Sequence, residues 1–211
     1  MIARTLRPAI AAPALALLLS GCLGSLLGGK PENLYRFGAP EAATTGAQGG
    51  PLPAGGRKVQ LVIPSFPIEA AGDRILTVEG ANASYIKDAR WVTAGPFLYR
   101  AALANQFAPG GPVVPLTERH RGDADYALRV RIDRFEARYE NGPKAPPVVE
   151  IDGTATLFDK AGKERASYAL ADREPAAANR TGEIVAAYDR AVARQTAGLA
   201  RWLGGQAGRG D

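Results

Sequence analysis

Alternation of apolar and polar residues predicts strands over most of the chain after residue 32. The clearest run is 125–139, where apolar side chains occupy every second position from Tyr126 to Ile132. The phase of the alternation changes after Arg134, which predicts a β-bulge near Asp133 and Arg134. Shorter runs with the same period predict further strands at 33–37, 58–63, 74–79, 84–91, 148–158 and 165–172.

Two other stretches follow a helical period. Residues 95–107 open on Gly-Pro and place Leu98, Ala102 and Leu103 on one face. Residues 181–203 form the longest periodic run, and we expect the pair Gly204-Gly205 to end that helix. The apolar stripe of this second helix consists of Ile184, Tyr188, Val192, Leu199 and Trp202.

The order of these elements predicts an α+β fold. Short turns join the last three strands, and the tight turn at 159–162 is one of them, so they should form an antiparallel meander. Two amphipathic helices bury their apolar stripes most simply on one face of a sheet. We therefore expect an antiparallel-rich mixed sheet with two helices packed on one face, preceded by a signal peptide and a flexible tether.

The start of the chain has the pattern of a bacterial lipoprotein signal. Basic residues at 1–7 precede an apolar run at 8–19, which is short for a membrane span. The run leads into a lipobox, and the chain's single cysteine, Cys22, falls at the one position where a lipobox requires it. A plain membrane span, or an ordinary signal with a chance cysteine, is the less favoured alternative. The lipobox is made of Leu19, Ser20 and Gly21 before Cys22.

These residues define the expected processing. Cleavage between Gly21 and Cys22 would leave Cys22 as the lipid-bearing N-terminus, with a covalent diacylglycerol and an N-acyl chain such as palmitate and no other cofactor. Leu23 rather than Asp follows the cysteine, which favours the outer membrane by analogy with enterobacterial sorting. The expected divisions are a signal peptide at 1–21, a tether at 22–32, a domain at 33–204 with a Gly/Pro loop at 38–57, and a disordered tail at 205–211.

Composition excludes several other classes of protein. The formal net charge of +5 includes Arg4 and Arg7 before Cys22, and the remaining excess is scattered, so no nucleic-acid groove is predicted. With one Cys, an intramolecular disulfide is impossible. With one Cys and one His, the usual zinc sites are implausible, and no metal site is predicted.

No catalytic centre stands out in the sequence. It contains no serine-nucleophile elbow and no phosphate loop. His120 lies in a polar run between arginines, and we interpret it as solvated rather than catalytic. Asp123 and Asp125 fit a strand entry better than a metal site. The sequon that starts at Asn82 is short enough to occur by chance.

Some aromatic and arginine side chains leave two interpretations open. Trp91 and Phe97 could line a lipid groove together with Tyr85 and Tyr99, or could fill the core between helix and sheet. The core is favoured for Trp91 and for Trp202. Arg129 and Arg131 alternate along one strand and could face a partner or phosphate head groups, although a solvated strand face is favoured.

The chain resembles the ABC-type transport auxiliary lipoproteins, the PqiC-like family, over roughly 33–203. Each matching piece is short, and the order and spacing of the pieces together carry the resemblance. The Gly/Pro loop and residues 92–95 depart from the family pattern. The matching pieces are 34–37, 61–66, 73–76, Tyr85, Trp91, 124–128, 134–136, 155–159, Gly162 and 200–203.

The resemblance implies a non-catalytic role. Such proteins look like the outer-membrane component of transport systems that pair an ABC permease and ATPase with an MCE-domain protein that carries lipid across the periplasm. The implied partners are the MCE-domain protein, the permease/ATPase complex and outer-membrane lipid, with a matching homo-oligomer if the partner is a ring. The alternatives are a structural envelope lipoprotein without a transport role and, less favoured, a small periplasmic hydrolase.

Overall fold

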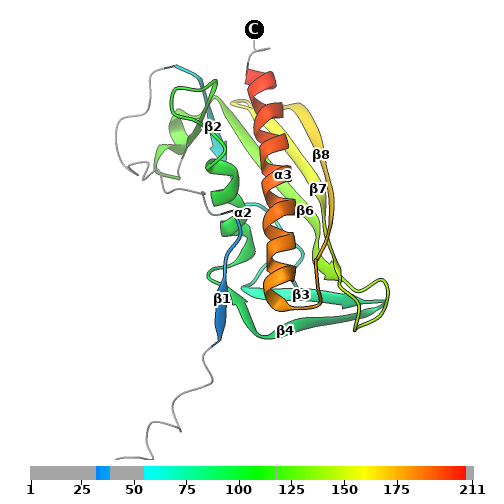
Figure 1. The fold of residues 1–211 in the computed structure, drawn as a ribbon. Helices are drawn as coiled ribbons and strands as arrows, with labels where there is room; N and C mark the ends of the chain where they lie inside the picture. The colour runs from blue at the N-terminus through cyan, green and yellow to red at the C-terminus, as the bar shows by residue number, and fades with distance from the viewer. Residues whose placement is uncertain (1–31, 39–54, 117, 208–211) are drawn as a thin grey trace, which may run out of the picture. The chain divides into compact units, whose positions relative to one another are not determined.

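A computed structural model describes residues 32–38, 55–116 and 118–207, and the chain from Asn33 onward forms one compact unit. Figure 1 shows its strands and helices in chain order. The strands are β1 (Asn33–Tyr35), β2 (Arg57–Leu61), β3 (Arg74–Glu79), β4 (Asn82–Trp91), β5 (Val113–Leu116), β6 (Tyr126–Arg138), β7 (Val148–Asp159) and β8 (Glu164–Pro175). The helices are α2 (Gly95–Ala104), the 3-10 helix η1 (Glu118–Asp123) and α3 (Thr181–Ala207).

The long strand β6 organises the sheet. On one side it pairs with antiparallel β7, which pairs with antiparallel β8, and this meander confirms the predicted one. On its other side β6 pairs with two strands in turn, both parallel to it: β2 near its start and β3 near its end. β5 extends the sheet beyond β2, and β4 and β1 extend it beyond β3. The result is the mixed, antiparallel-rich sheet that was predicted.

The predicted bulge in β6 is confirmed. The register with β7 shifts between Ile132 and Arg134, so Asp133 is the extra residue. Opposite the shift lies Gly153, where an added Cβ would come within 2.1 Å of the Arg131 carbonyl oxygen. Glycine therefore allows the bulged backbone of β6 to approach β7 closely.

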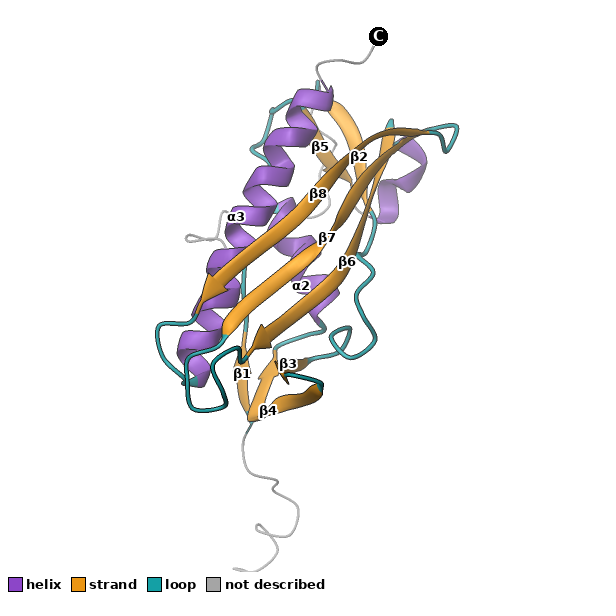
Figure 2. Cartoon of the chain, turned by 90° about the vertical axis from the view of Figure 1, so that its right-hand side faces the viewer, coloured by secondary structure: helices purple, strands orange, loops and turns teal. Residues whose placement is uncertain are grey.

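Both helices pack on one face of the sheet, as predicted. In Figure 2 the strands β6, β7 and β8 lie in front of α2, and α3 runs beside them. The core between the layers holds a chain of aromatic contacts in which Tyr188 packs against Trp91 and Phe135, with ring centroids 5.3 and 4.9 Å apart. Tyr188 itself is fully buried. Burial at this scale is the main stabilising term of the fold.

Several predicted boundaries are wrong, each for a local reason. α2 ends at Ala104 rather than at 107, because beyond the cap residue Asn105 the amides of Gln106 and Phe107 donate to carbonyl oxygens three residues back and no longer four. α3 runs through Gly204 to Ala207: Gly204 does not take the left-handed conformation of a cap and packs near Pro112. β5 was missed, since Pro115 argues against a strand, yet proline is tolerated in this edge strand.

Candidate functional site

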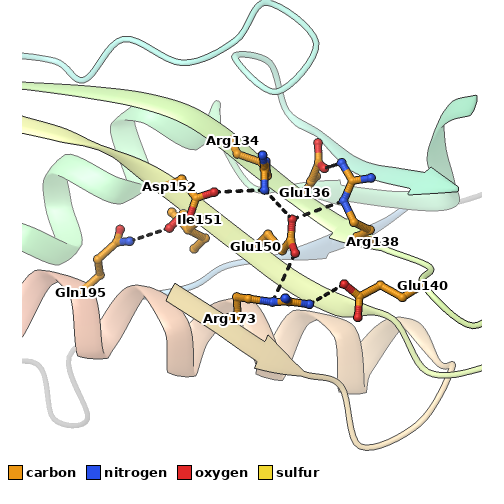
Figure 3. Close-up of polar contacts among 9 residues, drawn as sticks. All are labelled: Arg134, Glu136, Arg138, Glu140, Glu150, Ile151, Asp152, Arg173 and Gln195. Carbon is orange, nitrogen blue, oxygen red and sulfur yellow. Dashed lines mark hydrogen bonds and ion pairs between the residues drawn. The ribbon is translucent and has the colours of Figure 1, made fainter. Parts of the chain in front are cut away.

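The most organised polar cluster in the described part of the chain lies on the face of β6, β7 and β8 that is turned away from the helices. Glu150 of β7 is at its centre, and only 6% of its side chain is exposed. The antiparallel register sets Glu150 beside Glu136 on β6 and Arg173 on β8. We call this set the Glu150 cluster; it consists of Arg134, Glu136, Arg138, Glu140, Glu150, Asp152 and Arg173 (Figure 3).

Three arginines surround the Glu150 carboxylate. Arg134 Nη1 lies 2.9 Å and Arg138 Nε 3.3 Å from its Oε2 atom. Arg173 Nε lies 3.3 Å from the other oxygen, Oε1. A buried carboxylate needs such partners, because desolvation of an unpaired charge costs several kcal/mol. Glu150 thereby fixes the position of three cationic side chains that remain partly exposed.

An outer ring of carboxylates completes the cluster. Arg134 Nη1 also contacts Asp152 at 3.2 Å, while Arg138 pairs with Glu136 and Arg173 pairs with Glu140. The hydrogen bond to Glu150 raises the pKa of Arg134 above its ordinary value. Each guanidinium is thus shared by two carboxylates, which holds it in one orientation and suits it to recognition rather than to proton transfer.

The helix side of the same strands buries neutral polar groups instead. Gln195 of α3 donates from Nε2 to the carbonyl oxygen of Ile151 at 2.9 Å (Figure 3) and accepts the Tyr99 hydroxyl at 2.8 Å. The Tyr188 hydroxyl donates to the Leu76 carbonyl oxygen at 3.2 Å. Burial raises the pKa values of Tyr99 and Tyr188, so both phenols stay neutral.

A second set of ion pairs joins α3 to the edge strand β8. Arg194 Nη2 contacts Asp172 at 2.6 Å and Glu174 at 2.7 Å, and Arg190 Nε contacts Glu174 at 2.7 Å. The hydrogen bond from Arg190, supported by Arg194, lowers the pKa of Glu174. These contacts attach the helix layer to the sheet. β8 extends to Pro175, beyond the predicted end at 172, because its pairing with β7 continues to Val148.

Toward the start of β6, the uncovered face carries the two arginines singled out from the sequence. Both are exposed, which confirms the prediction of a solvated strand face. The Arg129 guanidinium lies 4.7 Å from the Phe158 ring centre, and Arg131 pairs with Asp133 at 3.1 Å. Small and hydroxyl side chains occupy the neighbouring positions of the same face on β7 and on the edge strand β8; they are Thr154, Thr156, Ser167, Ala169 and Ala171.

The residues predicted at the N-terminus, Leu19, Ser20, Gly21 and Cys22, lie outside the described residues, as does most of the Gly/Pro loop. His120 is half-buried in η1. Asp125 accepts the Lys58 amide at 2.9 Å, which lowers its pKa, and therefore acts at a strand entry as predicted.

The aromatic predictions divide between core and surface. Trp91 and Tyr99 are buried, so neither lines a groove, and the core position predicted for Trp91 is confirmed. Trp202 is half-buried against Tyr168, with ring centroids 5.5 Å apart. Of the two alternatives for Phe97, the core position is wrong, because its side chain is 45% exposed.

The part of the chain that the structure describes shows few features of a metal site, a membrane-spanning helix or a catalytic centre. Within it, no three side chains of the His, Cys, Asp or Glu type come together as metal ligands would, and no helix is long and apolar enough to cross a bilayer. One open hollow of about 420 Å³ lies beside the β7–β8 turn, where Lys160 pairs with Asp125 at 3.3 Å. This arrangement of ion pairs contains no nucleophile next to a base.

The sequence analysis did not identify the Glu150 cluster, although the alternation along 148–158 puts Glu150 on the face opposite to Val149 and Ile151. The tight turn at 159–162 alone would set Glu150 opposite Asp172, but the register shift between Leu157 and Phe158 moves its partner to Arg173, and no sequence pattern predicts that shift. The β6 half depends on a longer connection and on the bulge, and neither specifies a register from sequence.

Comparison with known proteins adds a family and a fold. A family model described as the ABC-type transport auxiliary lipoprotein component matches residues 35–200. The crystal structure of protein XCC0632 from Xanthomonas campestris, a DUF330 protein, is 18% identical with a TM-score of 0.64, covering 83% of this chain and 95% of that one. A crystal structure of an uncharacterized protein is also 18% identical, with a TM-score of 0.59 and coverage of 82% and 99%. At this identity the two structures establish a shared fold. No curated protein matches the chain.

Proposed function

Since this chain belongs to the family of ABC-type transport auxiliary lipoprotein components, we propose that it is the non-catalytic, outer-membrane lipoprotein of an ABC/MCE-type lipid transport system. In this proposal Cys22 carries the lipid anchor, and the domain docks the periplasmic MCE-domain protein. ATP hydrolysis belongs to the ATPase of the same system. The coarser statement, an auxiliary lipoprotein of an ABC-type transport system, follows from the family itself.

The observation that carries the proposal is the uncovered face of β6, β7 and β8. No described helix covers it, and its arginines are held in place by carboxylates rather than left to move freely. Arginines oriented in this way lose little conformational entropy on binding, which favours recognition of carboxylates on a protein partner. Arg129 and Arg131 extend the same face with more exposed guanidinium groups.

Co-purification from the native membranes after mild cross-linking tests the proposal. The native chain should recover an MCE-domain protein together with an ABC permease, and Cys22→Ala should lose both if the anchor is required. Recovery of cell-wall or unrelated envelope proteins alone would contradict docking and favour a structural envelope lipoprotein.

Charge reversal tests which face docks the partner. The double variant Arg129→Glu/Arg131→Glu should recover several-fold less MCE-domain protein, and the loss should shrink in added salt. Arg180→Glu is the matched control, because Arg180 is 74% exposed in its side chain but lies at the start of α3. Equal losses for the two variants would show that this face is not the docking surface.

A further inference from the structure

Exposed apolar side chains gather at one place in the described part of the chain. Among residues 32–38, 55–116 and 118–207, the large apolar side chains that are exposed are Leu34, Ile63, Ile68, Val92 and Phe97. All of these except Ile63 surround the short link between β4 and α2. Ile68 is 92% exposed and Val92 52%. We call Leu34, Ile68, Val92 and Phe97 the apolar end.

Backbone hydrogen bonds hold the segments of the apolar end together. The Val92 amide donates to the Tyr35 carbonyl oxygen at 2.7 Å, which fixes the link against β1. The Gly95 amide donates to the Gly72 carbonyl oxygen at 3.1 Å, which ties the loop that contains Ile68 to the start of α2. Figure 1 shows β1, the end of β4 and the start of α2 together. The four exposed side chains therefore lie on segments that backbone hydrogen bonds join around the link between β4 and α2.

Arginines border the same surface. Leu34 lies opposite Arg90 in the β1–β4 register, and the Arg90 guanidinium pairs with Asp73 at 3.2 Å. Arg36, just after the end of β1, is exposed. The Arg100 guanidinium lies 5.9 Å from the Phe97 ring centre. Apolar side chains bordered by arginine suit a lipid–water interface, where the apolar groups enter the acyl boundary and the guanidinium groups reach the phosphates.

The length of chain before β1 also indicates that a lipid surface contacts the apolar end. Asn33, the first residue of β1, comes eleven residues after Cys22. Eleven residues span at most about 40 Å when fully extended, so an anchor at Cys22 keeps the start of β1 close to a bilayer. Leu34 is the second residue of that strand.

We infer that the apolar end rests in the interfacial layer of the membrane that holds the lipid anchor. The inference rests on the anchor at Cys22, which is part of the proposed function, and goes beyond it by naming a second membrane contact. The anchor alone lets the domain rotate about its tether. A lipid-seated apolar end fixes its orientation, so that a docking face is presented to partners at a constant angle.

Tryptophan fluorescence of the mature, lipidated chain in vesicles tests this contact. The vesicles contain phosphatidylethanolamine and phosphatidylglycerol, with or without brominated phosphatidylcholine as a quencher in the acyl region. We expect the tryptophan added in Ile68→Trp and in Phe97→Trp to emit at shorter wavelength on the vesicles and to be quenched by brominated lipid, each measured as the difference from the native chain, which contains Trp91 and Trp202. Ile63→Trp is the matched control, because Ile63 is also exposed but lies outside the apolar end.

The possible outcomes separate this inference from the transport role. Equal quenching at positions 63, 68 and 97, or no quenching at 68 and 97, would overturn it. If the emission of Ile68→Trp moved to shorter wavelength only after the co-purified partner protein was added, that result would also overturn the inference and would assign this surface to a protein. Because the vesicles contain no transport protein, quenching at 68 and 97 would support the contact even if no MCE-domain protein co-purifies.

Discussion

Glu150 and Ile151 are neighbours on β7, yet the sheet buries the polar groups around them by different means on its two faces. Toward α3, the Ile151 carbonyl oxygen accepts a hydrogen bond from the neutral amide of Gln195, which also accepts the Tyr99 hydroxyl. Away from the helices, Glu150 is as buried as Gln195, with exposed fractions of 4% and 6%, but its carboxylate is charged and held by arginines. We call the face of the sheet toward α3 the closed face and the uncovered face of β6, β7 and β8 the open face. The closed face thus uses neutral hydrogen-bonded pairs, and the open face uses ion pairs.

The difference follows from access to water. Behind α3, a charged group would lose its hydration on every side, so neutral hydrogen bonds are the less costly solution. On the open face the arginines keep part of their hydration, since the side chains of Arg134 and Arg173 are 45% and 57% exposed. A binding surface can therefore keep ordered charges on the open face. The comparison predicts that adding a charge to the closed face and removing a charge from the open face lower the free energy of unfolding by different amounts.

Placing a charge on the closed face should have the largest effect. Gln195→Glu sets a carboxylate beside the Ile151 carbonyl oxygen with no cation opposite it, and we expect a loss of about 3–5 kcal/mol in the free energy of unfolding. The loss should be small below the pKa of about 4.3 that the new carboxyl has in the unfolded chain, and should grow as the pH rises above it. Urea unfolding across this pH range measures it. A variant as stable as the native chain at neutral pH would show that the closed face tolerates charge.

Gly153→Ala should rank second, because it acts on the bulge that brings β6 arginines to the open face. If β6 kept Asp133 but continued without the bulge, Asp133 would take the outward position, Arg134 would point toward the helices and Phe135 toward solvent. An added Cβ meets backbone, so we expect a loss of about 1–3 kcal/mol by thermal or urea unfolding. Gly182→Ala, where a Cβ meets nothing within 4 Å, is the control and should be neutral or slightly stabilising. Equal effects would mean that the close approach at Gly153 is relieved at no cost.

Removing the charge at the centre of the open face should cost less than adding one to the closed face. Glu150→Gln keeps the shape and leaves three partly exposed arginines, which water can solvate, so we expect a loss of about 1–2 kcal/mol. Added salt should narrow the difference from the native chain, because it screens these pairs. Urea unfolding at low and high salt measures both effects. A loss as large as that of Gln195→Glu would remove the distinction between the faces.

The two faces were not equally predictable from sequence. On the closed face, the alternation from Leu128 to Ile132 and the stripe on α3 identified buried side chains directly, because apolar period and burial coincide. On the open face the same alternation put Glu150 outside, since a pattern of polarity carries no information on which charges meet across strands. The parallel pairing of β2 and β3 with one edge of β6 joins segments far apart in the chain, and no local signal encodes it.

The smallest expected effect lies at the border of the two faces, where α3 meets β8. Arg190 and Arg194 lower the pKa of Glu174, so its ionised form is favoured in the folded chain. The stability from this pairing is fully present above the unfolded pKa of about 4.3 and is lost as the pH falls through the lower folded value. Glu174→Gln should therefore cost about 0.5–1 kcal/mol near neutral pH, and its difference from the native chain should shrink in acid. Thermal unfolding against pH checks this, with Glu164→Gln as an exposed control on the same strand. A cost independent of pH would mean that Glu174 contributes by packing, and that the border behaves like the closed face.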